Sequence, residues 1–194
     1  MSDTTVTDLQ VASRQARQVE VILSEQEKFA IATPVIEEFE LLEVMEEAVM
    51  VIPAGDTPEV TVRLRPDLAL FRVRAHRIAL QQVLGNLVLN AYEAIERHSS
   101  VTGEIDVAAF VADGSSMVHI TVRDTGCGFE EGVANRVFQR GYTSKSGSFT
   151  GLGLHWSANA VAGMGGRMYA ESPGPGQGAV FHLLLPLAEF RSKA

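Results

Sequence analysis

The sequence is poor in cysteine and in basic side chains, and each shortage excludes a class of protein. It contains one cysteine, Cys127, so an internal disulfide is excluded and a cysteine-based metal site is disfavoured. The 194 residues carry a net charge of -8, with an isoelectric point of about 5.1. Because binding to a phosphate backbone needs a cationic surface, we expect no nucleic-acid partner.

Long apolar runs are absent as well. No stretch is apolar over the roughly 20 residues that a membrane-spanning helix needs, and residues 1–5 lack the basic and apolar pattern of a secretory signal. We therefore expect a cytoplasmic chain without membrane contact. With 46% hydrophobic residues and no internal repeat, the 194 residues are sufficient for one domain with a real core and an appendage.

Residues 81–95 form an apolar helical run that carries one polar stripe. The polar positions recur at steps of three and four, which places them on one face of a helix: Gln82, Asn86, Asn90, Glu93 and Arg97. Two asparagines inside an apolar helix need a polar partner, because their amides compete for backbone hydrogen bonds. Carboxamide oxygens suit Mg²⁺ that is shared with substrate phosphates. A helix with one solvated face is the alternative interpretation.

A second segment, residues 122–129, follows an alternating run and predicts a strand that ends in a sharp glycine turn. Gly126 and Gly128 let the backbone approach a flat ligand closely. Asp124 is an acceptor-only group when ionised, and the exocyclic amine of a purine would satisfy it. A strand that leads into an ordinary tight loop has the same pattern.

A third segment, residues 145–154, is a loop of glycine and serine that runs into an apolar helix at 155–162. Exposed backbone amides at a helix N-terminus, with Lys145 nearby, form an anion site suited to phosphate. Arg136 and Arg140 add positive charge before this loop, although for Arg136 we prefer the interpretation of an ordinary surface residue. A plain junction between a loop and a helix would look similar.

In order and spacing, these segments resemble the N box and the first and second glycine boxes of the ATP-binding catalytic domain of sensor histidine kinases. That domain belongs to the superfamily of gyrase, the heat-shock chaperone ATPase and the mismatch-repair ATPases. Residues 137–145 are similar to the F box of the family, and residues 176–186 to its closing glycine box and last strand. The resemblance covers roughly residues 57–187.

The resemblance implies ATP and Mg²⁺ as ligands and gives each polar group a role. Asn90 would be the metal ligand, and Asn86 would support the phosphates or the helix face. Asp124 would hold the adenine amino group in a pocket shaped by Gly126 and Gly128. The remaining nucleotide contacts would come from the third segment and the residues before it: Thr143, Ser144, Lys145, Thr150, Gly151, Leu152, Gly153 and Leu154.

Glu93 completes the candidate catalytic set with Asn86 and Asn90. It would either polarise a metal-bound water or pair with Arg97 at i, i+4, and we prefer the salt pair. In related hydrolases a glutamate four residues before the metal asparagine positions water, whereas this chain has Asn86 there. A carboxamide is no general base at neutral pH, so transfer to a protein histidine is favoured over hydrolysis.

The order of elements predicts an α+β fold, a two-layer sandwich in which helices cover one face of a mixed sheet. The resemblance implies the same Bergerat-type ATP-binding fold for residues 35–194. We expect strands at 60–64, 70–72, 105–109, 118–123, 166–171 and 179–185, with a hairpin turn at Asp113-Gly114. Helices are expected at 37–50, 76–98, 131–138 and 154–164.

Residues 1–34 predict a separate helical segment that ends at Pro34. Small and apolar residues recur between 9 and 30 in alternating steps of three and four, as in a helix that packs against another helix. The resemblance implies a remnant of the dimerisation hairpin, and with it a homodimer through residues 9–30. An unpaired helix that faces solvent is the alternative.

Two departures from the family pattern bear on function. Ala75-His76 stands where the family often has Gly-Asp before the N-box helix, which puts the helix cap in doubt. No histidine precedes residue 76, and none lies in an H-E-x-x-x-P context. We therefore expect a kinase domain that donates the γ-phosphate to a histidine on a separate phosphoacceptor helix, with a response regulator downstream, and that does not phosphorylate itself. An anti-sigma-factor type serine kinase and an ATP-binding docking module without turnover are the alternatives.

Overall fold

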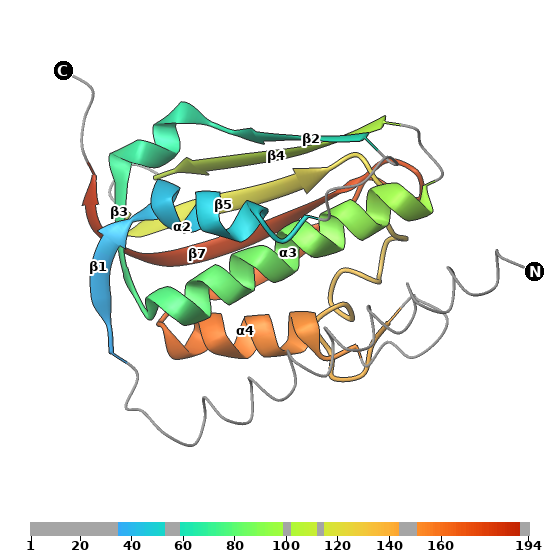
Figure 1. The fold of residues 1–194 in the computed structure, drawn as a ribbon. Coiled ribbons are helices and arrows are strands. Elements are labelled where there is room, and N and C mark those ends of the chain that lie inside the picture. Colours follow the sequence, from blue (N-terminus) through green and yellow to red (C-terminus); the bar gives the residue numbers. More distant parts are fainter. Residues whose placement is uncertain (1–34, 53–58, 99–101, 112–114, 144–150, 191–194) are drawn as a thin grey trace, which may run out of the picture. The chain divides into compact units, whose positions relative to one another are not determined.

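The computed structural model describes residues 35–52, 59–98, 102–111, 115–143 and 151–190 (Figure 1). The predicted helix at 1–34, the turn at Asp113-Gly114, and Ser144, Lys145 and Thr150 lie outside these residues. By its internal contacts the chain divides into two units, and every element below belongs to the second, which comprises residues 36–145 and 149–194.

A mixed sheet forms one layer of this unit. Its strands are β1 (Glu37–Glu40), β2 (Glu59–Leu64), β3 (Phe71–Ala75), β4 (Thr102–Phe110), β5 (Met117–Asp124), β6 (Arg167–Glu171) and β7 (Ala179–Phe190). Across the sheet the order is β1-β3-β7-β5-β4-β2, and β6 pairs with β7. Among the described strands, β2 and β4 form the one parallel pair. A parallel pair needs a crossover connection, which here runs through the short helix η1 (Pro66–Leu70), β3 and α3 (Arg77–Arg97).

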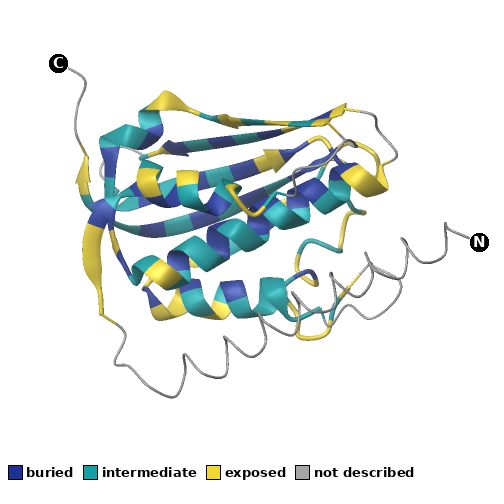
Figure 2. Ribbon diagram, viewed as in Figure 1, coloured by how far each residue is buried: buried dark blue, intermediate teal, exposed yellow. Residues whose placement is uncertain are grey.

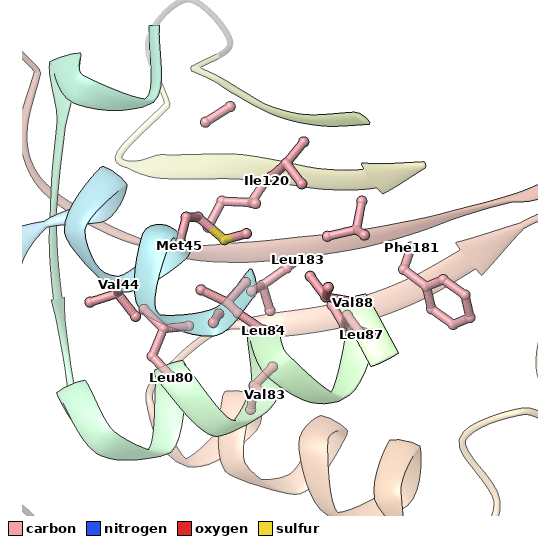
Figure 3. Close-up of a cluster of buried hydrophobic side chains, with 14 of the residues drawn as sticks. Val44, Met45, Leu80, Val83, Leu84, Leu87, Val88, Ile120, Phe181 and Leu183 are labelled. Carbon is pink, nitrogen blue, oxygen red and sulfur yellow. The ribbon is translucent and has the colours of Figure 1, made fainter. Parts of the chain in front are cut away.

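The helices α2 (Leu41–Val49), α3 and α4 (Gly153–Gly163) cover one face of the sheet (Figure 1). Successive residues of a strand point to opposite faces, and burial alternates accordingly along β4 and β5 (Figure 2). The core lies between the two layers, where α2, α3, β5 and β7 contribute fully buried side chains (Figure 3), including Met45, Leu84, Ile120 and Leu183. The predicted two-layer α+β fold is confirmed.

Charged side chains pair between strands on the other face of the sheet. Arg63 on β2 forms an ion pair with Glu104 on β4 at 2.9 Å, and both side chains are about half exposed, at 57% and 49%. An apolar face opposite the helices would have to be covered by a further layer, whereas charged side chains can be solvated directly. The described part of the chain therefore has its apolar core on the helical side.

The predicted helix at 76–98 is confirmed as α3, and the structure resolves the doubt about its cap. His76 is the N-cap residue, and its Nδ1 accepts a hydrogen bond from the backbone N–H of Ala79 at 3.2 Å. This contact satisfies one of the four N–H groups that a helix start leaves without a partner in the helix. His76 thus accepts the N-terminal hydrogen bond of the helix, as a capping aspartate would.

Two predicted helices are wrong in whole or in part. The helix expected at 37–50 begins only at Leu41, because residues 37–40 form β1 and pair with β3, with Phe39 buried against the core. The helix expected at 131–138 is a series of turns. Gly132 has a φ of 87°, a left-handed conformation that a right-handed helix does not contain. After Gly132 the backbone forms short-range hydrogen bonds, among them one from Arg136 N to Val133 O at 2.7 Å.

Candidate nucleotide site

The polar stripe of α3 faces the start of α4. Asn86 Nδ2 donates to Ser157 Oγ at 2.9 Å, and Asn90 Nδ2 donates to Asn86 Oδ1 at 3.4 Å. A Cβ atom at Gly153 would lie 2.8 Å from Asn86 Oδ1, a distance that real Cβ contacts do not reach. The first turn of α4 therefore reaches Asn86 only because residue 153 has no side chain. Two predicted site segments, the N box and the second glycine box, meet at this contact.

Asp124 ends β5 beneath the glycine turn, and the residue is 3% exposed. Its Oδ1 accepts from Gly126 N at 2.8 Å, whereas Oδ2 is buried and has no hydrogen-bond partner among the described residues. Burial raises the pKa of Asp124 to about 6, against the opposing effects of the Gly126 and Ala179 backbone amides and of the charge on Arg97. A buried carboxylate oxygen without a donor is costly, and a ligand that brings an N–H group removes the cost.

The glycine turn after Asp124 is fixed on one side by α3. A Cβ at Gly126 would lie 2.5 Å from the carbonyl carbon of Ala94, and Cys127 N donates to Ala94 O at 3.0 Å. Gly126, predicted to shape an adenine pocket, thus also lets the turn pack directly on the helix backbone. Cys127 contributes its backbone N–H to this contact.

The other side of the turn is fixed by residues 172–178. Gly178 N donates to Gly126 O at 3.0 Å and Gly176 N to Cys127 O at 2.7 Å. Ser172 Oγ accepts from Phe129 N at 3.1 Å and also lies 2.7 Å from Gly178 O. The turn that carries Gly128, at a φ of 56°, is therefore held between α3 and the segment before β7.

The third predicted segment is partly described. Gly141 N donates to Gly151 O at 3.2 Å, so the two ends of the intervening loop meet. Thr143 is exposed, Leu152 is the residue that precedes α4, and Leu154 lies in its first turn, half-buried. The guanidinium of Arg136 lies 5.3 Å from the centre of the Tyr142 ring, and the surface role preferred for this arginine stays a prediction.

Glu93 and Arg97 are neighbours on α3, as their spacing predicts. The Arg97 Nε donates to the backbone carbonyl of Glu93 at 3.1 Å. The side-chain salt pair that we preferred remains a prediction, and so does the role of Glu93 toward a metal-bound water. Among the described residues, no group of three or more histidine, cysteine or carboxylate side chains is arranged to hold a metal ion.

Ser157 and Ser172 are the site residues that the sequence interpretation missed. Asp124 and Ser157 are the two buried polar residues among those described, at 3% and 0% exposed. Leu154, Ser157 and Val161 lie at i, i+3 and i+7 spacing, and a serine on this apolar face of the helix was a usable signal. For Ser172, which lies in a loop of glycine and proline, the sequence offers no comparable signal.

The structure thus has asparagine amides along α3, the buried carboxylate of Asp124 and a glycine-rich start of α4 in one domain. The chain matches a known family over the same region. Residues 75–189 match the family of histidine kinase-, DNA gyrase B-, and HSP90-like ATPases. This is more than half of the chain, and the chain belongs to that family. None of the helices in the described residues is long and apolar enough to cross a membrane.

The curated relatives are sensor kinases. The chain is 38% identical over 130 residues to the sensor protein FixL of Bradyrhizobium diazoefficiens, which covers 67% of this chain and 25% of FixL. It is 34% identical over 144 residues to the signal transduction histidine-protein kinase AtoS of Escherichia coli, which covers 74% of this chain and 22% of AtoS. The chain thus spans about a quarter of the length of these relatives.

Solved structures agree on the fold. The mycobacterial sensor histidine kinase MprB superposes with a TM-score of 0.64 at 22% identity, over 80% of this chain and all (100%) of the MprB chain. The catalytic domain of histidine kinase ThkA, nucleotide-free, gives a TM-score of 0.60 at 26% identity, over 78% of this chain and 95% of that chain. The chain carries an ATP-binding catalytic domain of the sensor histidine kinase type.

Proposed function

We propose that this domain binds Mg-ATP and presents the γ-phosphate to a histidine on a phosphoacceptor helix of a sensor kinase. The observation that carries the proposal is the buried Asp124 Oδ2, which has no hydrogen-bond partner among the described residues and lies beside a tightly held glycine turn. The exocyclic amine of adenine is a donor without charge, and it supplies the N–H group that Oδ2 needs. Guanine has a carbonyl at the same ring position and would meet the carboxylate as a second acceptor.

The phosphates would lie at the other end of the site. Asn90 would contribute its Oδ1 to Mg²⁺, with the phosphates and water as the remaining ligands, in keeping with the few protein ligands that Mg²⁺ takes when it is bound with a nucleotide. The residues present fit such an ion, because Asn86 already holds the Asn90 amide in the structure. Mg²⁺ would supply charge neutralisation during phosphoryl transfer.

The helix start and the loop before it would hold the phosphate oxygens. Gly151, Leu152, Gly153 and Leu154 lie at the N-terminus of α4, where backbone N–H groups favour an anion. Thr143 is exposed at the edge of the loop, and Ser144, Lys145 and Thr150 would contribute from within it. Asn86 and Glu93 complete the candidate set, with Asn86 in a supporting role toward Asn90.

The acceptor would be a histidine on another helix. The side chains of four of the five histidines lie within hydrogen-bond distance of other groups in the domain. His76 caps α3, His155 Nδ1 lies 3.0 Å from Phe138 O, and His119 Nε2 lies 2.9 Å from His182 Nδ1. We propose that the kinase acts in the cytoplasm, that residues 9–30 contribute to a homodimer, and that the phosphate passes on to a response regulator.

Transfer of labelled phosphate tests the proposal. The chain is incubated with γ-labelled ATP and Mg²⁺, with and without a separately supplied phosphoacceptor hairpin from a sensor kinase. We expect label on the hairpin that is lost in acid and retained in alkali, and little label on the chain itself. Acid-stable label would instead identify a serine kinase, and ATP binding without transfer to any acceptor would identify a docking module.

An Asp124→Ala variant is the control for the nucleotide site. It removes the proposed adenine acceptor and leaves the stripe on α3 intact, so binding and transfer should fall together. Normal ATP affinity in a folded Asp124→Ala chain would refute the assigned adenine contact. Circular dichroism of the variant shows whether the chain is folded.

A further inference from the structure

We propose that Ser157 is a positioning residue for the Mg²⁺ ligand Asn90, acting through Asn86. The inference rests on the proposed function, because it assumes that Asn90 binds the cation of Mg-ATP. It assigns a role to a residue of α4 that lies outside every motif singled out in the sequence. Ser157, Asn86 and Asn90 are called the amide relay below.

The relay begins at a buried hydroxyl. Ser157 is 0% exposed and lies where α4 packs against α3. A buried hydroxyl without a hydrogen bond destabilises a protein, whereas an alanine at an interface between helices does not. Ser157 Oγ accepts from Asn86 Nδ2 at 2.9 Å, a short and well-formed bond. The hydroxyl is thus used to hold the side chain of Asn86.

The relay continues to Asn90. The donor Nδ2 and the acceptor Oδ1 of an amide point in different directions. When Asn86 donates Nδ2 to Ser157, its Oδ1 therefore points away from Ser157. In the structure Oδ1 faces Asn90 Nδ2 at 3.4 Å. Because Asn90 donates Nδ2 to Asn86, its own Oδ1 points away from Asn86. This oxygen is the hard ligand that a Mg²⁺ ion would use.

Gly153 shows how closely α4 is fitted to the relay. A Cβ at this position would lie 2.8 Å from Asn86 Oδ1 and 3.0 Å from Asn86 Nδ2. The amide of Asn86 is therefore bounded by Gly153 on one side and bonded to Ser157 one turn further along the same helix. Both contacts restrict the rotation of Asn86, so α4 and not α3 alone determines where the amide points.

The test separates positioning from packing by comparing variants of α4. Ser157→Ala removes the acceptor, Ser157→Cys keeps the approximate size with a weak acceptor, and Ser157→Thr keeps the hydroxyl. Val161→Ala is the matched control, because Val161 is 0% exposed on the same helix and its side chain cannot form a hydrogen bond. For each chain, ATP affinity is measured by calorimetry at a series of Mg²⁺ concentrations and in excess chelator.

Ser157→Ala and Ser157→Cys should raise the Mg²⁺ concentration at half-effect about 3- to 10-fold, the consequence of losing one neutral hydrogen bond. Their ATP affinity in chelator should stay within about twofold of the unmodified chain. Ser157→Thr should keep the Mg²⁺ response even where its larger side chain lowers Tm. Val161→Ala should lower Tm and leave the Mg²⁺ response unchanged.

The relay is refuted if Ser157→Ala responds to Mg²⁺ as the unmodified chain does, or if affinity falls equally with and without the ion. A changed Mg²⁺ response in Val161→Ala would also refute it. The relay is checked without nucleotide by the side-chain ¹⁵N amide resonances of Asn86 and Asn90, both of which should move in Ser157→Ala. If those resonances move while the unmodified chain binds no ATP, the proposed function fails, and the assignment of a cation fails with it.

Discussion

Replacing Asp124 by Asn should stabilise the domain at neutral pH relative to acidic pH while it weakens ATP binding. The carboxyl group is buried, and one of its oxygens is without a partner among the described residues. Ionisation of this group therefore lowers the free energy of unfolding of the domain. An asparagine has the same shape and retains an acceptor for the Gly126 amide, but it carries no charge. The variant therefore removes the ionisation and leaves the local backbone contacts in place.

The magnitude follows from the pKa of Asp124, which burial raises from 3.8 to about 6. At about 1.4 kcal/mol per pKa unit, this difference corresponds to about 3 kcal/mol. Between pH 3.8 and 6 the folded chain holds a proton that the unfolded chain has released. The contribution of Asp124 to the free energy of unfolding therefore falls as the pH rises through this range, and it is lowest above pH 6.

Denaturant unfolding of both chains between pH 4 and 8 measures the effect. The quantity of interest is the free energy of unfolding of Asp124→Asn minus that of the unmodified chain at each pH. We expect this difference to increase by about 2 kcal/mol from pH 4 to pH 8, because part of the full effect falls below pH 4. The amide of the variant brings a donor that needs an acceptor, which adds an offset that is the same at every pH.

Ser157→Ala is the matched control for this experiment. It changes the other buried polar residue of the described chain, and because serine does not ionise in this range, its effect on stability should be independent of pH. Parallel stability curves for Asp124→Asn and the unmodified chain would refute the reasoning. They would mean that the carboxyl group ionises in the folded chain as it does in the unfolded one.

Three further predictions concern other positions. Asn90→Ala should weaken ATP binding in Mg²⁺ far more than in chelator, as calorimetry would show, and equal losses would indicate a structural asparagine. Gly126→Ala should lower Tm severely, because its Cβ would lie 2.5 Å from the Ala94 backbone, and a Tm within a few degrees of the unmodified chain would contradict this close packing. Burial lowers the pKa of His119 and His182, so the unfolded chain binds protons more readily below pH 6.5 and these two residues should lower the free energy of unfolding there. Replacing both by Gln should remove this loss, so the variant should gain stability relative to the unmodified chain as the pH falls in denaturant unfolding.

Periodicity predicted the helix that positions the site, because α3 keeps one apolar face over six turns and tertiary contacts reinforce the local preference. Shorter segments gave less reliable predictions. Glutamate-rich residues 37–40 have the composition of a helix, but pairing with β3 determined their conformation. Residues 131–138 have a helical pattern, but the positive φ at Gly132 and the turns that follow it override this pattern.

The site itself was predictable where the chemistry of one residue type is specific. A buried aspartate at the end of a strand needs a donor, and the structure shows one of its oxygens buried without one among the described residues. The partner of Asn86 was not predictable, because Ser157 is separated from it by 71 positions and the contact depends on how two helices pack. Sequence spacing indicates which residues share a helix face, and tertiary structure decides what that face contacts.

The hydrogen bond between Gly141 and Gly151 joins the chain on both sides of the segment 142–150. A segment whose ends are joined in this way can change in length with little effect on the body that carries it, since doubling the length of a closed loop costs only about 0.6 kcal/mol. We therefore expect the segment between these two glycines to tolerate changes of length and sequence, in evolution or by engineering, with little effect on the stability of the rest of the domain.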